Sequence, residues 1–376
     1  MQAKNKFSRF MVILFKIFVV IVSIIIIHIT YPIVTVKLLA LYLKHIEPNK
    51  EENLTEKFKE EIEQDYKEFT KSGEPEEQCK LGALYYQFGK YKEALELIEP
   101  SANKDYAPAQ LLLGTMYCLG NGVNKDLKKA FVWVEKAANQ GLADAQSFLG
   151  LMYLQGEAVT PNLTLAFNWI EKAASQGYAE AQYYLGLFYL RGWRVSQDLT
   201  LAFNWIEKAA SQGYADAQNE LGLMYDKGKG VMQDYNKAFE LYEKAAKQDC
   251  AEAQNNLGFM YDTGKGVMQD YNKALELYAK AANQDCAEAQ NNLAYMYYCG
   301  KGVMQDYNKA IEWYTKAANQ GYAIAQYNLG SMYYYGKGVM QDYNKAVEWY
   351  TKAANQGHKN SQKKLKDIQL KSARSF

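Results

Sequence analysis

Histidine, the side chain most often used for acid–base catalysis and metal binding, is nearly absent from this sequence. The 376 residues contain three of them, His28, His45 and His358. The chain has no phosphate-binding loop, no G-x-S-x-G nucleophile motif and no H-E-x-x-H zinc motif. We therefore expect no catalytic residue, no cofactor, no metal site and no small-molecule substrate.

The cysteines do not form a recognisable metal site either. There are five, Cys79, Cys118, Cys250, Cys286 and Cys299, and no C-x-x-C pair, which argues against a zinc site. Cys286 and Cys299 flank one expected helix, about 20 Å apart at 1.5 Å per residue, beyond the reach of a disulfide. We expect thiols rather than disulfides, which favours a reducing compartment.

Composition narrows the class of protein further. Lys and Arg total 43 and Asp and Glu 42, so the net charge of +1 gives no field that would collect nucleic acid. Hydrophobic residues make up 49% of the chain and there are only 6 prolines, which indicates a folded chain rich in helix.

The elements that must position any functional side chain are repeats. The glutamine of an A-x-A-Q motif recurs at intervals of 36 residues, so that seven copies span residues 107–358. A fixed period of this length is typical of a solenoid. The repeated glutamines are Gln110, Gln146, Gln182, Gln218, Gln254, Gln290 and Gln326.

One copy, residues 215–250, shows what each repeat should form. Leu221 and Met224 follow helical spacing, Gly230 then interrupts the helix, and Tyr242 lies on the apolar face of a second helix. Asp234 stands at the expected N-cap of that second helix. Each repeat is therefore predicted to be an antiparallel helix pair, with its repeated Tyr and Trp residues in the core.

The ends of the repeats also follow a pattern. Most copies end in Gln-Gly, which suits a left-handed residue after a helix, and Asp249 and Asp285 replace that glycine in two copies. Copy two has Ala158 in place of the second loop glycine, and copy three has Trp193 and Arg194 in its loop. We expect those two loops to differ in shape from the others.

The repeat resembles the Sel-1-like repeat, a relative of the tetratricopeptide repeat. In copy four, Leu221-Gly222, Met224-Tyr225, Gly230-Val231, Asp234 and Lys244-Ala245-Ala246 carry the match. The resemblance implies an all-α, right-handed solenoid whose first helices line a concave face, and a role as a non-catalytic scaffold or adaptor. Some cysteine-rich members are labelled β-lactam hydrolases, but they carry paired cysteines in each repeat, which this chain lacks.

The flanking segments complete the solenoid. Residues 71–106 resemble a tetratricopeptide-type first repeat with a shorter turn, and residues 359–376 are predicted to form a polar capping helix and tail. The repeated lysines, such as Lys244, are interpreted as a solvated, charge-balanced face.

Partner binding is predicted at first-helix positions that vary between copies. Asparagine carries both a donor and an acceptor and can bind a peptide backbone, whereas tyrosine adds contact area at low entropic cost. We expect this groove to bind a protein or an extended peptide. The predicted groove residues are Tyr183, Tyr184, Asn219, Asn255, Asn256, Asn291, Asn292, Tyr327 and Asn328.

The N-terminus is a separate element. After a basic tail, residues 1–10, we predict an uncleaved transmembrane signal anchor over residues 11–36 and a charged spacer over residues 37–70. The alternatives are a cleaved signal peptide and a buried core helix. The anchor includes Ile17, Phe18, Ile24, Ile25, Ile26 and Ile27.

Together these observations predict a single-pass membrane protein that presents an interaction groove. Three basic residues precede the anchor and three follow it, and the short basic tail favours placing the repeats on the non-cytoplasmic side. The alternative functions are a secreted repeat protein that acts in the envelope or on host cells and, less favoured, a hydrolase.

Overall fold

The computed structural model describes residues 73–156 and 158–374. Within these ranges the regular structure is formed by seventeen α-helices. No helix of this part of the chain is both long and apolar enough to cross a bilayer. The anchor predicted for residues 11–36 and the spacer predicted for residues 37–70 lie outside the described residues.

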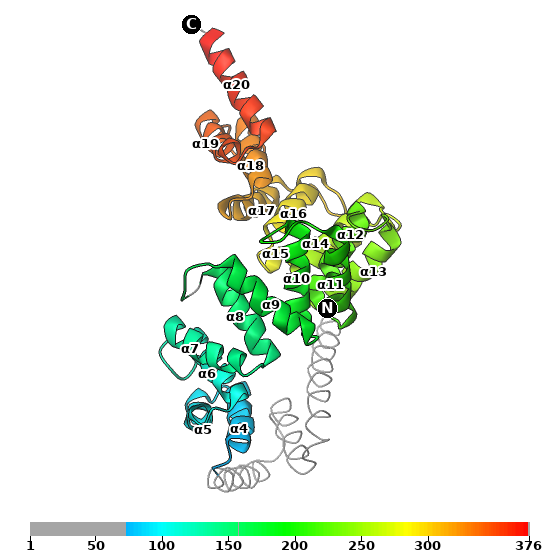
Figure 1. Ribbon diagram of the computed structural model, residues 1–376. Helices are drawn as coiled ribbons and strands as arrows, with labels where there is room; N and C mark the ends of the chain where they lie inside the picture. The colour runs from blue at the N-terminus through cyan, green and yellow to red at the C-terminus, as the bar shows by residue number, and fades with distance from the viewer. Residues whose placement is uncertain (1–72, 157, 375–376) are drawn as a thin grey trace, which may run out of the picture. The chain divides into compact units, whose positions relative to one another are not determined.

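The helices alternate as first and second members of hairpins, and α20 (Lys359–Arg374) follows the last hairpin (Figure 1). The first helices are α4 (Pro75–Gln87), α6 (Ala107–Leu119), α8 (Ala143–Gln155), α10 (Ala179–Arg191), α12 (Ala215–Lys227), α14 (Ala251–Thr263), α16 (Ala287–Cys299) and α18 (Ala323–Tyr335). The second helices are α5 (Tyr91–Asn103), α7 (Leu127–Asn139), α9 (Leu163–Ser175), α11 (Leu199–Ser211), α13 (Tyr235–Ala246), α15 (Tyr271–Asn283), α17 (Tyr307–Asn319) and α19 (Tyr343–Asn355).

The chain divides into two compact units, residues 1–133 and 134–376. In the described part of the first unit, α4, α5 and α6 pack around Leu97, Ile98, Leu113 and Met116, which are at most 1% exposed. In the second unit, successive helices from α8 to α20 pack on one another, which is the arrangement of an α-solenoid.

Close approach within a hairpin depends on small residues. In the fourth repeat, Leu221 and Met224 of α12 are buried against Tyr242 of α13. A Cβ added at Gly222 would lie 2.8 Å from the Tyr242 ring, so the absence of a side chain there makes room for the tyrosine. The helix pair predicted for residues 215–250 is confirmed.

The local signals at the helix ends are confirmed as well. Asp234 Oδ1 accepts hydrogen bonds from the backbone N–H groups of Asn236 at 3.0 Å and Lys237 at 3.1 Å, which caps α13. At the other end of the repeats, Gly213 has a φ of 90°, and Asp249 and Asp285 have φ values of 62° and 61°. These residues all adopt the left-handed conformation that the Gln-Gly pattern predicts.

The difference in shape expected for loops two and three does not extend to their left-handed residue. Loop three does have a hydrogen bond of its own, from the Val195 N–H to Trp193 O at 2.7 Å. Ala158 and Arg194 have φ values of 67° and 64°, matching 70° at Gly230, so the left-handed turn is kept. A residue with a Cβ loses roughly 1–2 kcal/mol in the left-handed conformation. The packing of the helices on both sides of the loop outweighs this cost and fixes the path of the loop. Arg194 Nε also donates to Thr164 Oγ1 at 3.0 Å, which ties its loop to α9.

Two glycine substitutions should separate backbone strain from steric overlap. Gly213 (φ 90°) has open space around an added Cβ, whereas a Cβ on Gly230 would lie 2.5 Å from Leu199 O. We expect Gly213→Ala to lower the free energy of unfolding by about 1–2 kcal/mol through backbone strain. Gly230→Ala should lower it by the same strain and by about 1–3 kcal/mol more, because its Cβ overlaps a neighbouring atom. Urea unfolding measures both, and equal losses would contradict the close contact at Gly230.

Glutamine side chains join each repeat to the next. Gln218 Nε2 donates to Ala210 O at 3.2 Å, and Gln218 Oε1 accepts a hydrogen bond from Gln248 Nε2 at 2.9 Å. The bond to Ala210 crosses to the preceding repeat, whereas the Gln218–Gln248 pair lies within one repeat, and corresponding 2.8–2.9 Å glutamine pairs occur within other repeats of the second unit. The A-x-A-Q glutamine is therefore a buried polar link whose hydrogen bonds are satisfied within the framework.

The repeated tryptophans differ from the core role predicted for them. Trp169, Trp205, Trp313 and Trp349 are half-buried, because each lies at the edge of the hairpin beneath a lysine of the same helix. The lysine Nζ atoms lie 4.0–4.1 Å from the ring centroids. In the last two repeats these lysines, Lys316 and Lys352, also pair with a glutamate one turn earlier. Lys280, at the same repeat position, pairs with Glu276 in the same way, as expected for a charge-balanced face.

The C-terminal helix α20 packs against α19. Ser361 is fully buried, and its backbone N–H donates to His358 Nδ1 at 3.3 Å. Burial lowers the pKa of His358, which favours the neutral imidazole that can accept this bond. The histidine at the end of the last repeat therefore has a structural role.

Within the described residues, no disulfide joins the cysteines. Burial raises the pKa of Cys79 to about 12 and that of Cys250 to about 11, so these two thiols are protonated at neutral pH. They behave as small core residues rather than as nucleophiles.

Candidate partner-binding face

The predicted groove residues lie on five consecutive first helices of the second unit. They are Tyr183 and Tyr184 on α10, Asn219 on α12, Asn255 and Asn256 on α14, Asn291 and Asn292 on α16, and Tyr327 and Asn328 on α18.

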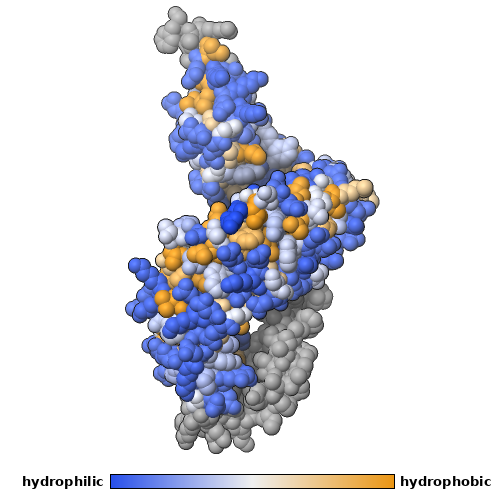
Figure 2. All heavy atoms as spheres, in the orientation of Figure 1, coloured by the Kyte–Doolittle hydropathy of each residue, from blue (hydrophilic) through white to orange (hydrophobic). Residues whose placement is uncertain are grey.

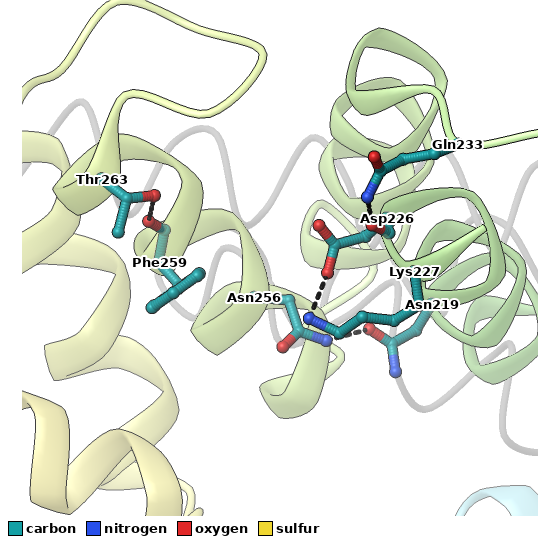
Figure 3. Close-up of polar contacts among 7 residues, drawn as sticks. All are labelled: Asn219, Asp226, Lys227, Gln233, Asn256, Phe259 and Thr263. Carbon is teal, nitrogen blue, oxygen red and sulfur yellow. Dashed lines mark hydrogen bonds and ion pairs between the residues drawn. The ribbon is translucent and has the colours of Figure 1, made fainter. Parts of the chain in front are cut away.

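The asparagines bind one another across neighbouring repeats. Asn256 Nδ2 donates to Asn219 Oδ1 at 2.9 Å (Figure 3). The same 2.9 Å bond recurs from Asn292 to Asn255 and from Asn328 to Asn291. In each pair the donor lies 37 positions after the acceptor, so the bonds link α12, α14, α16 and α18.

Two of these asparagines are inaccessible to a partner in this structure. Asn255 is 2% exposed and Asn291 7% exposed, and both serve as acceptors for the next repeat. Asn219, Asn256, Asn292 and Asn328 are half-buried. Peptide binding by the whole set stays a prediction, but the structure shows a framework function for the paired amides.

Removing one buried acceptor should therefore destabilise the fold. Asn255→Ala leaves the Asn292 amide without its acceptor and is expected to cost about 1–3 kcal/mol in free energy of unfolding. Asn219→Ala is the matched control, because Asn219 occupies the same repeat position but is half-buried and should cost less. A double-mutant cycle between Asn255 and Asn292 in urea unfolding measures the bond. Additive effects of the two substitutions would contradict it.

The tyrosines of the predicted set pack in two clusters. The Tyr183 ring lies 5.3 Å from that of Tyr184 and 5.5 Å from that of Tyr214, and burial raises the pKa of all three phenols. The Tyr327 ring lies 5.5 Å from that of Tyr350 and 5.0 Å from the His358 imidazole. The structure thus places the cluster of Tyr183 and Tyr184 at one end of the face and the cluster of Tyr327 at the other end. It does not bring the two clusters together.

Exposed aromatic residues outside the predicted groove set lie one or two turns further along the same helices. Phe259 on α14, Tyr295 on α16 and Tyr335 on α18 are 41%, 43% and 55% exposed. Phe259 and Tyr295 are three residues after Asn256 and Asn292, a spacing that places them on the same side of the helix. Extending the helical spacing from the variable asparagines would have found them.

We call the exposed side of these helices the first-helix face, defined by Asn256, Phe259, Asn292, Tyr295 and Tyr335. Figure 3 shows part of it, with Asn219, Asp226 and Lys227 from α12 opposite Asn256, Phe259 and Thr263 from α14. Hydrophobic residues form small separate groups on the visible side of the molecule, among mainly hydrophilic residues (Figure 2).

Charged side chains accompany the aromatic rings of this face. Lys265 Nζ lies 5.5 Å from the Phe259 ring centroid, and Lys301 Nζ lies 5.4 Å from that of Tyr295. Lys301 also pairs with Asp262 Oδ1 at 2.9 Å. Partial burial opposes the charge on Lys301, but the hydrogen bond and the charge of Asp262, together with Tyr271 and Tyr295, outweigh it, so that the pKa of Lys301 is raised and the amine stays protonated.

A hollow of about 510 Å³ lies at the N-terminal ends of α10 and α12 and is lined in part by Tyr178, Glu180 and Tyr214. Ser147 Oγ donates to Glu180 Oε2 at 3.0 Å. Burial raises the pKa of Glu180, although the Ser147 bond lowers it in part. The hollow offers aromatic surface and one partly buried carboxyl group to a donor on a partner.

The described residues hold no cluster of three or more His, Cys, Asp or Glu side chains arranged to bind a metal ion. The arrangement of the first-helix face, with exposed rings beside lysines, suits contact with another macromolecule.

Comparison with protein families finds the Sel1 repeat in seven consecutive segments. They are residues 107–142, 143–178, 179–214, 215–250, 251–286, 287–322 and 323–358. Together the segments cover more than half of the chain. A comparison with curated proteins found no match.

Two solved structures are similar over most of the chain. One is a protective antigen present in uropathogenic Escherichia coli strains, described as displaying an SLR fold, with 35% identity and a TM-score of 0.61 over 83% of this chain and 67% of that one. The other is a Sel1 repeat protein from Oxalobacter formigenes, with 36% identity and a TM-score of 0.55 over 81% of this chain and 89% of that one.

Proposed function

Because the chain belongs to the Sel1 repeat family, we propose that it is a non-catalytic scaffold that binds a protein or an extended peptide along its first-helix face. Sel1 repeat proteins generally mediate protein–protein interactions. The proposal adds the location of the binding surface and the residues that contact the partner.

The observation that carries the proposal is the exposure of Phe259, Tyr295 and Tyr335 on three consecutive first helices. Large aromatic residues that stay this exposed on a folded domain contribute little to its own core, whereas aromatic anchors dominate binding at interfaces. Lys265 and Lys301 beside two of the rings add cation–π and charge contacts. The face therefore suits a partner that brings apolar groups together with carboxylates or backbone carbonyls.

The asparagine pairs support this surface indirectly. They bring α12, α14, α16 and α18 into direct contact, which favours the side carrying the first helices as the concave side of the stack. Their bonds also hold the helices in fixed register, so the exposed rings are preorganised for binding.

We also propose the membrane arrangement predicted from the sequence. Residues 11–36 would anchor the chain as a single transmembrane helix, with residues 37–70 as a spacer and the repeats on the non-cytoplasmic side. Protease protection of a C-terminal tag in sealed cells, with detergent as the control, tests the orientation. A mature N-terminus beyond Ala40 would contradict the anchor.

A second candidate function is a released repeat protein that acts in the envelope or on host cells. The similarity to the Escherichia coli protective antigen favours it. The same face would bind the partner in that case, so the two candidates differ in location rather than in the interaction.

Site-specific photo-cross-linking in cells tests the proposed face. A photoreactive phenylalanine analogue at Phe259 or Tyr295 should form a discrete adduct with one partner, whereas the same analogue at Leu201 on α11, which is 39% exposed, should not. The same adducts from all three positions, or none from Phe259 and Tyr295, would refute binding at the first-helix face.

A further inference from the structure

The ten methionines in the described part of the chain fall into two classes. Six occupy one first-helix position and are 0–2% exposed, and four occupy one loop position and are 85–91% exposed. The buried ones are Met116, Met152, Met224, Met260, Met296 and Met332. The exposed ones, which we call the loop methionines, are Met232, Met268, Met304 and Met340.

Loop geometry enforces this exposure. In the fourth repeat, Val231 packs against the core, and Gln233 Nε2 donates to Asp226 O at 2.7 Å (Figure 3). Asp234 caps α13. The residues around Met232 are thus all held by the protein, and Met232 itself points away from it, 88% exposed.

The same arrangement recurs in the last four of the seven repeats. The loop sequence G-K-G-V-M-Q-D-Y is identical at residues 228–235, 264–271, 300–307 and 336–343. The glutamine bond to a first-helix carbonyl is present in each, at 2.7–2.9 Å. In repeats one to three the loop position carries Asn124, Thr160 and Ser196 instead.

A thioether in this position is accessible to reagents and contributes little to packing. Its sulfur lone pair can attack the electrophilic oxygen of hydrogen peroxide, forming the S=O bond of a sulfoxide as the O–O bond breaks and the peroxide is reduced to water. Hypochlorous acid reacts similarly and leaves chloride. A sulfoxide on an exposed loop disturbs no core contact, whereas a sulfoxide at a buried methionine would place a polar group among apolar side chains.

We propose that the loop methionines form a reversible oxidation site. Peroxide or hypochlorous acid converts Met232, Met268, Met304 and Met340 to sulfoxides while the helices stay folded. Methionine sulfoxide reductases, which act on exposed sulfoxides, restore the thioethers. Oxidation changes a row of four apolar side chains into polar ones at the loop end of the repeats, independently of the proposed partner-binding face.

Peptide mass mapping of the full chain in detergent during hydrogen peroxide treatment tests the proposal. Each loop methionine should oxidise within about threefold of the rate of free N-acetylmethionine amide. The buried methionines should react about 100-fold more slowly or less, because their sulfur is reached only when the packed helices open. Met1 and Met11 are followed as separate peptides.

The fold and the reversal are measured on the same sample. When the four loop positions are oxidised, the far-UV circular dichroism and the melting temperature should be unchanged, and reductase treatment should remove the added oxygens. The matched control replaces all four, Met232→Ser, Met268→Ser, Met304→Ser and Met340→Ser, after the serine that repeat three carries at this position. This variant should lose the fast oxidation and keep its melting temperature.

Three results would overturn the proposal: loop methionines protected about 10-fold or more relative to the free amino acid, buried methionines that oxidise at the same rate as the loops, or a loss of helical signal as the loops oxidise.

Discussion

Replacing Tyr242 with alanine is expected to lower the free energy of unfolding by about 3–5 kcal/mol, the usual cost of removing a large buried aromatic ring. Tyr242 is 2% exposed, and its ring fills the space left by Gly222 on the facing helix. Burial, together with the nearby carboxylates of Asp226 and Glu220, raises the pKa of the phenol. It therefore stays neutral in the core throughout the physiological range.

Two further substitutions make the Tyr242 measurement specific. Tyr242→Ile should cost clearly less than Tyr242→Ala, because Ile206 fills the equivalent space opposite Gly186 in the third repeat. Tyr343→Ala, at a position 53% exposed, should change stability by about 0.5 kcal/mol or less. Urea unfolding followed by far-UV circular dichroism measures all three. A loss for Tyr242→Ala no larger than that for Tyr343→Ala would contradict the packing described here.

The second large effect is expected on partner binding. The double variant Phe259→Ala and Tyr295→Ala should weaken binding of the cross-linked partner by about 1,000-fold, because aromatic anchors contribute about 2 kcal/mol each when they are hot spots. Both side chains are more than 40% exposed, so their removal should leave the fold intact.

Calorimetry or surface plasmon resonance with the purified partner measures this loss. Leu201→Ala on α11 is the control, since Leu201 is 39% exposed but lies on a second helix. An unchanged dissociation constant in the double variant, with melting temperature also unchanged, would place the interaction elsewhere and refute the first-helix face.

The local part of the fold could be predicted from the sequence because its signals act within a few residues. Asp234 caps α13 through its own neighbouring amides, and Gly213 and Asp249 end their repeats in the left-handed conformation. The interval of 36 residues predicts that successive helix pairs stack, since one pair cannot bury its apolar side alone.

The candidate site could be predicted only in part. Variation between copies pointed to the first helices but did not distinguish their buried side chains from their accessible ones. Asn255 and Asn291 vary as functional positions do, yet they are buried in bonds to the next repeat. The reason is that a pairing over 37 residues depends on the rotation between neighbouring hairpins, which no local rule sets.

The sequence by itself determined the helix pairs, their boundaries and the repeat family, because capping, glycine turns and apolar spacing are local and recur in every copy. Only the tertiary structure decided which variable residues face a neighbour and which face solvent. It also decided that Ala158 and Arg194 keep the left-handed turn. In both cases packing between repeats, acting over distances far longer than a helical turn, outweighs the preference of the individual residue.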